Sequence, residues 1–233
     1  MGEMAERKGI SGSTLKIIAI VTMFVDHAGY AFSNGNHLRF MRIIGRVAFP
    51  IFIFLLVEGF VHTHDRRRYA LRLAGFALLS ELPFNLLLTG DVWDIRFAYQ
   101  NVLFTMLFGF LTIWGLEKVE SCVHQFWLRT VASGILIFGG MFLAELFQTD
   151  YAAAGVLAIV AMYLLRAQKA TGVLAGCLVL CSLGGLEWYC LAAVIPILLY
   201  NGRRGLRLKY IFYAFYPVHL LFLYMIARFA GFY

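Results

Sequence analysis

The amino-acid sequence predicts an all-α integral membrane protein, a polytopic bundle of about nine transmembrane helices with the N-terminus inside and the C-terminus outside. Apolar residues make up 61% of the 233 residues and charged residues only 14%, against about 45–50% and 25% in soluble proteins. The mean hydropathy is +0.78. The apolar residues form runs long enough to cross a bilayer, and the basic residues lie in short loops between these runs.

The same numbers exclude other classes of protein. A soluble chain of this size needs more polar surface, and a disordered chain has far fewer apolar residues. Four cysteines without a CxxC motif exclude a disulfide scaffold. The net charge of +7 is explained by the Lys and Arg excess of cytoplasmic loops, so no nucleic-acid partner is expected. No hydrophilic stretch is long enough for a soluble domain, which predicts one transmembrane domain over residues 1–233.

A hydrocarbon core of about 30 Å needs about 20 helical residues, and the first candidate run carries Asp26 and His27. This run has no convincing small-residue cleavage site, so we predict a transmembrane helix and not a cleaved signal. Two short runs meet at Gly184 and Gly185 and are either two spans or one broken hairpin. The predicted spans are 13–33, 43–61, 69–89, 97–116, 127–147, 150–165, 170–184, 187–200 and 209–230.

The distribution of basic residues predicts the orientation. With these spans, fifteen of the 20 Lys and Arg residues lie on the side of the N-terminus. The positive-inside rule therefore places the N-terminus in the cytoplasm and the C-terminus outside. The five basic residues on the other side are Arg39, Arg42, Arg46, Arg96 and Arg228.

Ionisable residues inside the spans indicate a functional site, because they are costly in hydrocarbon. The predicted topology puts most of them at a similar depth, which predicts one polar site in the outer half of the bilayer. His219 falls near the midplane and Glu58 in the cytoplasmic half. The residues of the outer half are Asp26, His27, Arg42, Arg46, Glu81, Asn101, Glu145 and Glu187.

Several of these residues have a purely structural interpretation as well. Asp26 is able to neutralise Arg42 or Arg46, and the two arginines form either a structural network or an anion site. Glu81 is either an arginine partner or a catalytic acid. Tyr213, Tyr216 and His219 are spaced by three and share one side of the last span. An aromatic belt explains Tyr210 and Tyr213 but not His219. The cysteines look like small buried apolar residues, and we expect no metal.

The basic cytoplasmic loops allow two interpretations. Residues 66–68 (RRR) and 201–205 (NGRRG) are explained by topology and anionic lipid. They also fit a site for the phosphates of a phosphorylated donor.

Several motifs run in order along nearly the whole chain: 15–27 (LKIIAIVTMFVDH), 42–52 (RIIGRVAFPIF), 80–84 (SELPF), 101–105 (NVLFT), 150–151 (DY), 200–205 (YNGRRG) and 212–219 (FYAFYPVH). Together they resemble the TraX family, which is named for a conjugation protein that N-acetylates the amino terminus of F-type pilin. The family is similar to a wider group of transmembrane acyltransferases, including the sugar O-acyltransferases of bacterial envelopes and the lysosomal heparan glucosaminide acetyltransferase.

The resemblance implies a multi-pass acyltransferase of the bacterial cytoplasmic (inner) membrane. Acetyl-CoA, or another acyl-CoA, enters from the cytoplasm, and an amine or hydroxyl of an unidentified envelope or secreted acceptor is modified from outside. The catalytic histidine of the related enzymes maps onto His27, and Arg42 and Arg46 resemble the paired arginines of the O-acyltransferases. Either direct transfer or an acyl-histidine intermediate is compatible with this chemistry.

The chemistry assigns expected roles to the remaining residues. His27 is the expected general base, with Asp26 or Glu81 fixing its tautomer. The expected donors to the oxyanion are Asn101, Tyr216, His219 or an arginine, and His219 is alternatively a wall of the pantetheine channel. The residues expected to contact the acceptor are Arg42, Arg46, Asn101 and Tyr216, and those expected to bind the phosphates of CoA are Arg67, Arg203, Arg204 and Lys209.

Two other functions are alternatives to an acyltransferase. A proton-coupled secondary transporter also uses intramembrane carboxylates and histidines. Such transporters usually contain two repeats with matched broken helices, and no repeat is visible in this sequence. A non-catalytic assembly factor would have polar residues spread over the helix contacts instead of gathered at one depth.

Overall fold

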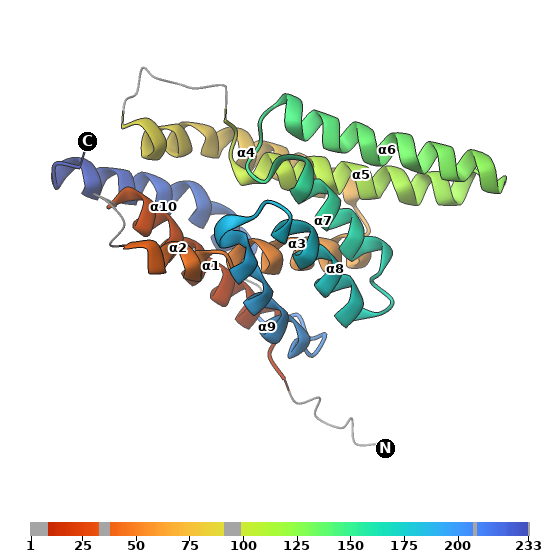
Figure 1. Ribbon diagram of the computed structural model, residues 1–233, viewed down its shortest axis with the longest axis horizontal. Helices are drawn as coiled ribbons and strands as arrows, with labels where there is room; N and C mark the ends of the chain where they lie inside the picture. Colours follow the sequence, from red (N-terminus) through yellow and green to blue (C-terminus); the bar gives the residue numbers. More distant parts are fainter. Residues whose placement is uncertain (1–8, 33–37, 91–98, 207–208, 233) are drawn as a thin grey trace.

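The structure is a computed structural model that describes residues 9–32, 38–90, 99–206 and 209–232, without the side chains of residues 209–212. The side chain of Lys209, an expected phosphate ligand, therefore lies outside the described part. Figure 1 shows an all-helical bundle. The helices are α1 Gly12–Ala31, α2 Arg39–Gly45, α3 Ala48–His62, α4 Arg66–Thr89, α5 Val102–Cys122, α6 Phe126–Leu146, α7 Ala152–Leu164, α8 Lys169–Cys181, the 3-10 helix η2 Gly185–Ala193, α9 Val194–Leu198 and α10 Lys209–Phe229.

Within the described residues, five segments are long and apolar enough to cross a membrane, and shorter apolar helices follow them. The five are α1, α2 with α3, α4, α5 and α6. The predicted all-helical class is confirmed, and several apolar helices lie where spans were predicted. The number of nine crossings stays a prediction. α6 lies at the edge of the bundle beside α5 (Figure 1), and apolar side chains such as Phe138 and Trp127 point away from the protein. In a bilayer these side chains would face lipid.

Three predicted spans differ from the structure, and two of them are those at 97–116 and 187–200. The span predicted at 97–116 is displaced, because the side-chain oxygen of Asn101 accepts a hydrogen bond from the Leu103 amide (3.1 Å) and caps α5 at this point. The span predicted at 187–200 is not one α-helix: the 3-10 helix η2 precedes the five-residue α9. Gly184 and Gly185 have φ angles of +75° and +58°, which glycine adopts without strain, and they turn the chain from α8 into η2.

The predicted span at 43–61 is divided into α2 and α3 by a break that positions Arg46. Pro50 lies in the first turn of α3 and has no amide hydrogen to donate to the Arg46 carbonyl four residues earlier. The amides of Arg46 and Val47 bond to Ile43 and Ile44, three residues back, at 3.2 and 3.3 Å. This tighter turn ends α2 and leaves Arg46 at the corner between the two helices.

The contacts between loops agree with the predicted alternation of sides. On the side of the N-terminus, Ile10 pairs with Tyr200 and Arg66 forms an ion pair with Glu117 (2.5 Å). On the other side, the Gln100 amide donates to the Gln148 carbonyl (3.1 Å). α1 and α10 are parallel, because both start at the loop around residue 200 and their ends meet through the rings of Phe32 and Phe232, 5.5 Å apart.

We expect parallel α1 and α10 to put the two chain ends on opposite sides of the membrane. A reporter enzyme that is active only outside the cytoplasm should therefore be active when fused after Tyr233. The same reporter inserted at His124, between α5 and α6, should be inactive. Activity at His124 without activity at Tyr233 would reverse the predicted orientation, and activity at neither position would contradict an odd number of crossings.

Candidate functional site

Two intramembrane histidines meet where α1 packs against α10. The Nδ1 of His27 lies 2.8 Å from the Nε2 of His219, and their ring centroids are 5.0 Å apart. The Nδ1 of His219 lies 2.7 Å from the carbonyl oxygen of Phe215, one turn earlier on α10. The ring of Tyr216 stands edge-on to both imidazoles. Because Tyr213, Tyr216 and His219 are spaced by three, they lie along one side of α10. His219 is the last of the three and contacts His27.

A buried ion network lies beside this pair and joins α1, α2 and η2. Asp26 forms ion pairs with Arg42 (2.6 Å) and Arg46 (2.7 Å), one through each carboxylate oxygen. Arg46 also forms an ion pair with Glu187 (2.6 Å) and donates to the Tyr151 hydroxyl (3.3 Å). Both oxygens of Asp26 are therefore occupied by arginines. Asp26 was expected to be catalytic, but here it anchors the two guanidinium groups.

Gly45 makes the close approach of α2 to α1 possible. A Cβ atom at this position would lie 2.1 Å from Oδ1 of Asp26, a distance that side chains do not tolerate. Tyr151 closes the other side of the network, with its ring stacked on Phe49 at a centroid distance of 3.9 Å. The network therefore depends on packing as well as charge.

Glu81 takes part in a separate contact, not in the expected contact with His27. It accepts a hydrogen bond from the Asn101 side chain (2.5 Å) and one from Asn85 (3.1 Å). The Asn101 amide group donates its second hydrogen to the Ala77 carbonyl (2.9 Å). Both amide hydrogens are used, so this conformation leaves Asn101 none for an oxyanion. In this arrangement Glu81 and Asn101 join α4 to α5, and His219 lies beside His27. The roles expected for Glu81 and Asn101 in catalysis and acceptor binding stay predictions.

Asp150 adds a carboxylate near the network, in the turn between α6 and α7. The Tyr99 hydroxyl donates to its Oδ1 (2.7 Å). Burial raises the pKa of the Asp150 carboxyl, while the hydrogen bond from Tyr99 and the nearby Arg46 lower it. Glu145, expected at the same depth, is exposed and accepts from the Ala153 amide (3.2 Å), so it caps α7.

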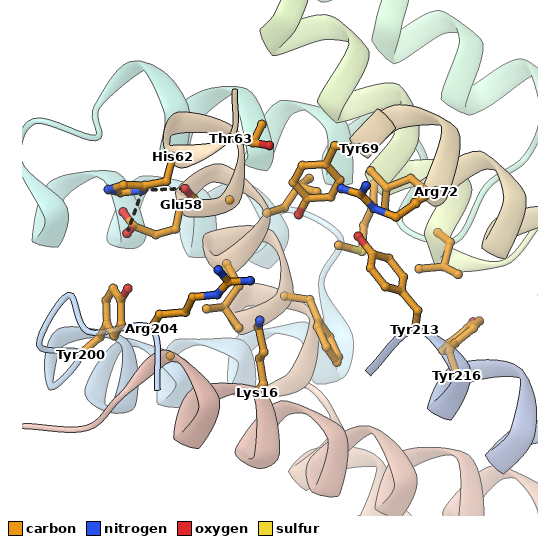
Figure 2. Close-up of a pocket in the computed structure, with 18 of the residues that line it drawn as sticks. Lys16, Glu58, His62, Thr63, Tyr69, Arg72, Tyr200, Arg204, Tyr213 and Tyr216 are labelled. Atoms are coloured by element: carbon orange, nitrogen blue, oxygen red, sulfur yellow. Dashed lines mark hydrogen bonds and ion pairs between the residues drawn. The ribbon is translucent and has the colours of Figure 1, made fainter. Parts of the chain in front are cut away.

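A cavity of about 470 Å³ leads from the predicted cytoplasmic face toward the histidines. Its volume is in the usual range for small-molecule sites, about 300–1,000 Å³. Figure 2 shows Lys16 and Arg204 extending into it near Tyr200 and His62, at the end formed by the loops. At the other end the wall includes Tyr216, whose ring contacts both histidines.

The middle of the cavity holds a polar cluster inside the bundle. Figure 2 shows Tyr69, Arg72 and Tyr213 directed toward one another, and the guanidinium of Arg72 lies 5.5 Å from the centroid of the Tyr69 ring. The Nε of Arg72 is buried and has no hydrogen-bond partner in the described residues. The remaining wall is mostly apolar and includes Met23, Leu56, Leu73, Val102, Leu103 and Met106.

One face of α1 connects the cavity to His27. Gly12, Lys16 and Met23 line the cavity, and at 100° per residue they lie within about 60° of His27 around the helix. From Gly12 to Met23 the axis advances about 16 Å, and His27 follows one turn later. The sequence counts Lys16 among the fifteen basic residues on the side of the N-terminus, and its spacing from His27 also puts it on the same face of α1.

The expected phosphate ligands divide into two groups. All three described arginines are exposed, but only Arg204 lines the cavity, whereas Arg203 and Arg67 are not part of its wall. Lys16 and Arg72 were not expected there and supply the other basic groups. Arg72 was missed because it stands only four residues beyond the cytoplasmic RRR segment. Among the described residues, no group of three His, Cys, Asp or Glu side chains is placed to hold a metal ion.

The comparisons with known proteins give a family match over most of the chain. The family described as TraX protein matches residues 11–227. The chain is also similar to a probable fimbrial assembly protein FimC, serogroup H1, of Dichelobacter nodosus. The two are 28% identical over 247 aligned residues, which cover 94% of this chain and 97% of the relative. No solved structure gives a significant match.

Proposed function

The chain belongs to the TraX protein family, and from this premise we propose that it is a membrane-embedded acyltransferase. It would move an acyl group, in the first instance acetyl, from cytoplasmic acyl-CoA to an amine or hydroxyl of an acceptor outside. His27 would be the general base, and the protein would lie in the bacterial cytoplasmic membrane.

One observation carries this proposal: Lys16 and Arg204 line the cytoplasmic end of the cavity, most of the remaining wall is apolar, and the other end includes Tyr216, whose ring contacts both histidines. Coenzyme A has the matching asymmetry, with anionic phosphates at one end and a long thin pantetheine arm at the other. In this proposal Lys16 and Arg204, which line the cavity, would hold the phosphates through charge-assisted hydrogen bonds. Arg72, with an unsatisfied Nε, is placed to meet a polar group further along the arm.

The proposed reaction needs a base and a place for the proton. His27 accepts the proton of the acceptor as the acceptor's nitrogen or oxygen attacks the thioester carbonyl. The C–S bond then breaks, and His27 returns the proton to the thiolate of CoA. Direct transfer of this kind is what we propose, because the acceptor and the thioester approach His27 from opposite ends.

The acceptor is proposed to be an envelope or secreted component presented from outside. The name of the fimbrial relative concerns fimbrial assembly, which makes the subunits of surface fibres the first acceptors to test. Mass spectrometry of envelope proteins, with and without this chain, should show a mass increase of one acyl group on the acceptor.

The direct test uses the purified full-length protein in nanodiscs with acetyl-CoA. We expect saturable binding of CoA and release of free CoA thiol that increases when the acceptor is added. Binding without any thiol release, with acceptors from the envelope present, would contradict the enzymatic role. A folded protein that binds no CoA would instead favour the alternative, a proton-coupled transporter.

Arg204→Ala should raise the apparent KM for acyl-CoA by about tenfold or more, because a hydrogen bond to a charged group contributes about 1.5–3 kcal/mol. Part of this effect is electrostatic, so the increase should be larger at low salt than at high salt. The neighbouring Arg203→Ala variant is the matched control, since Arg203 lies outside the cavity wall, and its KM should stay unchanged. Equal KM values for the two variants would contradict a role of Arg204 in binding acyl-CoA. The basic residues of this loop would then serve only to orient the protein in the membrane.

A further inference from the structure

We infer that His219 is a positioning residue that fixes His27 in the tautomer with a free Nε2, by accepting the hydrogen of His27 Nδ1. This inference rests on the proposed function for its catalytic consequence. The arrangement itself follows from two hydrogen bonds and is testable without any substrate.

The direction of both hydrogen bonds follows from the Phe215 carbonyl. A carbonyl oxygen only accepts, so the Nδ1 of His219, 2.7 Å away, must carry the hydrogen. In a neutral imidazole the other nitrogen is then an acceptor. The Nε2 of His219 therefore accepts from the Nδ1 of His27, at 2.8 Å. Since His27 carries its hydrogen on Nδ1, its Nε2 has a free lone pair.

Burial argues against the alternative in which His219 carries both hydrogens. The His219 side chain is 3% exposed, and the rings of Phe24 and Phe215 lie against it, with Phe215 stacked at 4.7 Å. Within the described residues, no carboxylate forms an ion pair with it. A cation at this place would be costly, because a buried charge needs a partner.

The two hydrogen bonds that link Phe215, His219 and His27 resemble those of a catalytic triad. The neutral imidazole of His219 stands where a triad has the orienting carboxylate. When His27 takes the acceptor's proton on Nε2, the Nε2 of His219 still accepts the Nδ1 hydrogen and stabilises the charged ring. In this tautomer His219 has no hydrogen available for the thioester oxyanion. The inference therefore replaces the expected oxyanion role of His219.

The structural test is nitrogen NMR on protein labelled with ¹⁵N-histidine in nanodiscs, without ligand. The chain has six histidines, and a His27→Gln variant identifies the signals of His27. We expect His27 to show a protonated Nδ1 and an unprotonated Nε2. In His219→Phe, which keeps a ring but removes the acceptor, the signals should shift toward the other tautomer. A wild-type His27 with a protonated Nε2 would overturn the inference, even if the protein proves to be an acyltransferase.

The kinetic test compares His219→Phe with His219→Gln, whose side-chain oxygen is able to accept the Nδ1 hydrogen. His219→Phe should lower kcat by about 10²–10⁴-fold and leave the KM for acyl-CoA near wild type, as expected for a misplaced tautomer. His219→Gln should recover a large part of the loss. Equal loss in both variants, with an unchanged His27 tautomer by NMR, would assign His219 a packing role. If the wild type releases no CoA, the proposed function fails, while the NMR result still decides the tautomer.

Discussion

His27→Ala should remove nearly all acyl transfer, lowering kcat by about 10³-fold or more, while acyl-CoA still binds. General acid–base catalysis by one group contributes about 10²–10⁴-fold, and His27 contacts Tyr216, which lines the inner end of the cavity. The cavity wall itself does not include His27, so the affinity for CoA should change little. Single-turnover release of CoA thiol gives the rate, and titration calorimetry gives the dissociation constant.

His62→Ala is the matched control for this experiment. It removes an imidazole at the cytoplasmic end of the same cavity, where the side chain is exposed and interacts with Glu58 of its own helix. Its kcat should remain within a few-fold of wild type. Wild-type turnover in His27→Ala would show that another group is the base. If His27→Ala also lost CoA binding, the loss of turnover would report damage to the bundle and not the loss of a base.

Hydrophobic runs and basic loops were sufficient to predict the class of the protein and most of its spans. α1, α4, α6 and α8 agree with the runs to within a few residues. Contacts between the loops also agree with the predicted sides. Each of these features is predictable from one stretch of sequence. A span is recognised by about 20 apolar residues, and the side on which a loop lies is predicted from the charge of that loop alone.

Backbone irregularities were less predictable. The break after Gly45 was marked by Pro50, but a proline within an apolar run does not reveal whether the helix bends or ends. The 3-10 form of η2 has no comparable signal in its nine residues. Both irregularities matter for the site. The break after Gly45 positions Arg46, η2 contains Glu187, and the two side chains form an ion pair.

Partner choice between helices was the least predictable feature. Asp26 was correctly considered as a partner of Arg42 or Arg46, because the two segments are neighbours in the chain and opposite in charge. The pairing of His27 with His219 spans 192 positions, and depth alone did not distinguish it from a pairing of His27 with Glu81. In the structure Glu81 pairs with Asn101 and not with His27, because the side chain of Asn101, which caps α5, donates a hydrogen bond to it.

Asp26→Asn should destabilise the whole bundle, by about 3–5 kcal/mol, because removing one member of a buried ion pair leaves its partner charged and uncompensated. Here one carboxylate serves two arginines, and the side chains of Asp26 and Arg46 are only 11% and 12% exposed. The loss should appear as a lower midpoint of unfolding in detergent and as reduced expression. Any loss of turnover should follow the loss of folded protein.

Two further variants test whether the loss of stability in Asp26→Asn comes from an uncompensated buried charge. Asp26→Asn combined with Arg42→Gln leaves the Arg46–Glu187 ion pair at 2.6 Å as a neutral unit, so this double variant should recover a good part of the lost stability. Arg68→Ala breaks an ion pair with Asp65 in which the arginine side chain is 80% exposed, and it should cost no more than about 1 kcal/mol. A midpoint for Asp26→Asn equal to that of Arg68→Ala would mean that water or lipid headgroups already reach the two arginines. Asp26 would then be free to act on the substrate and not only on the fold.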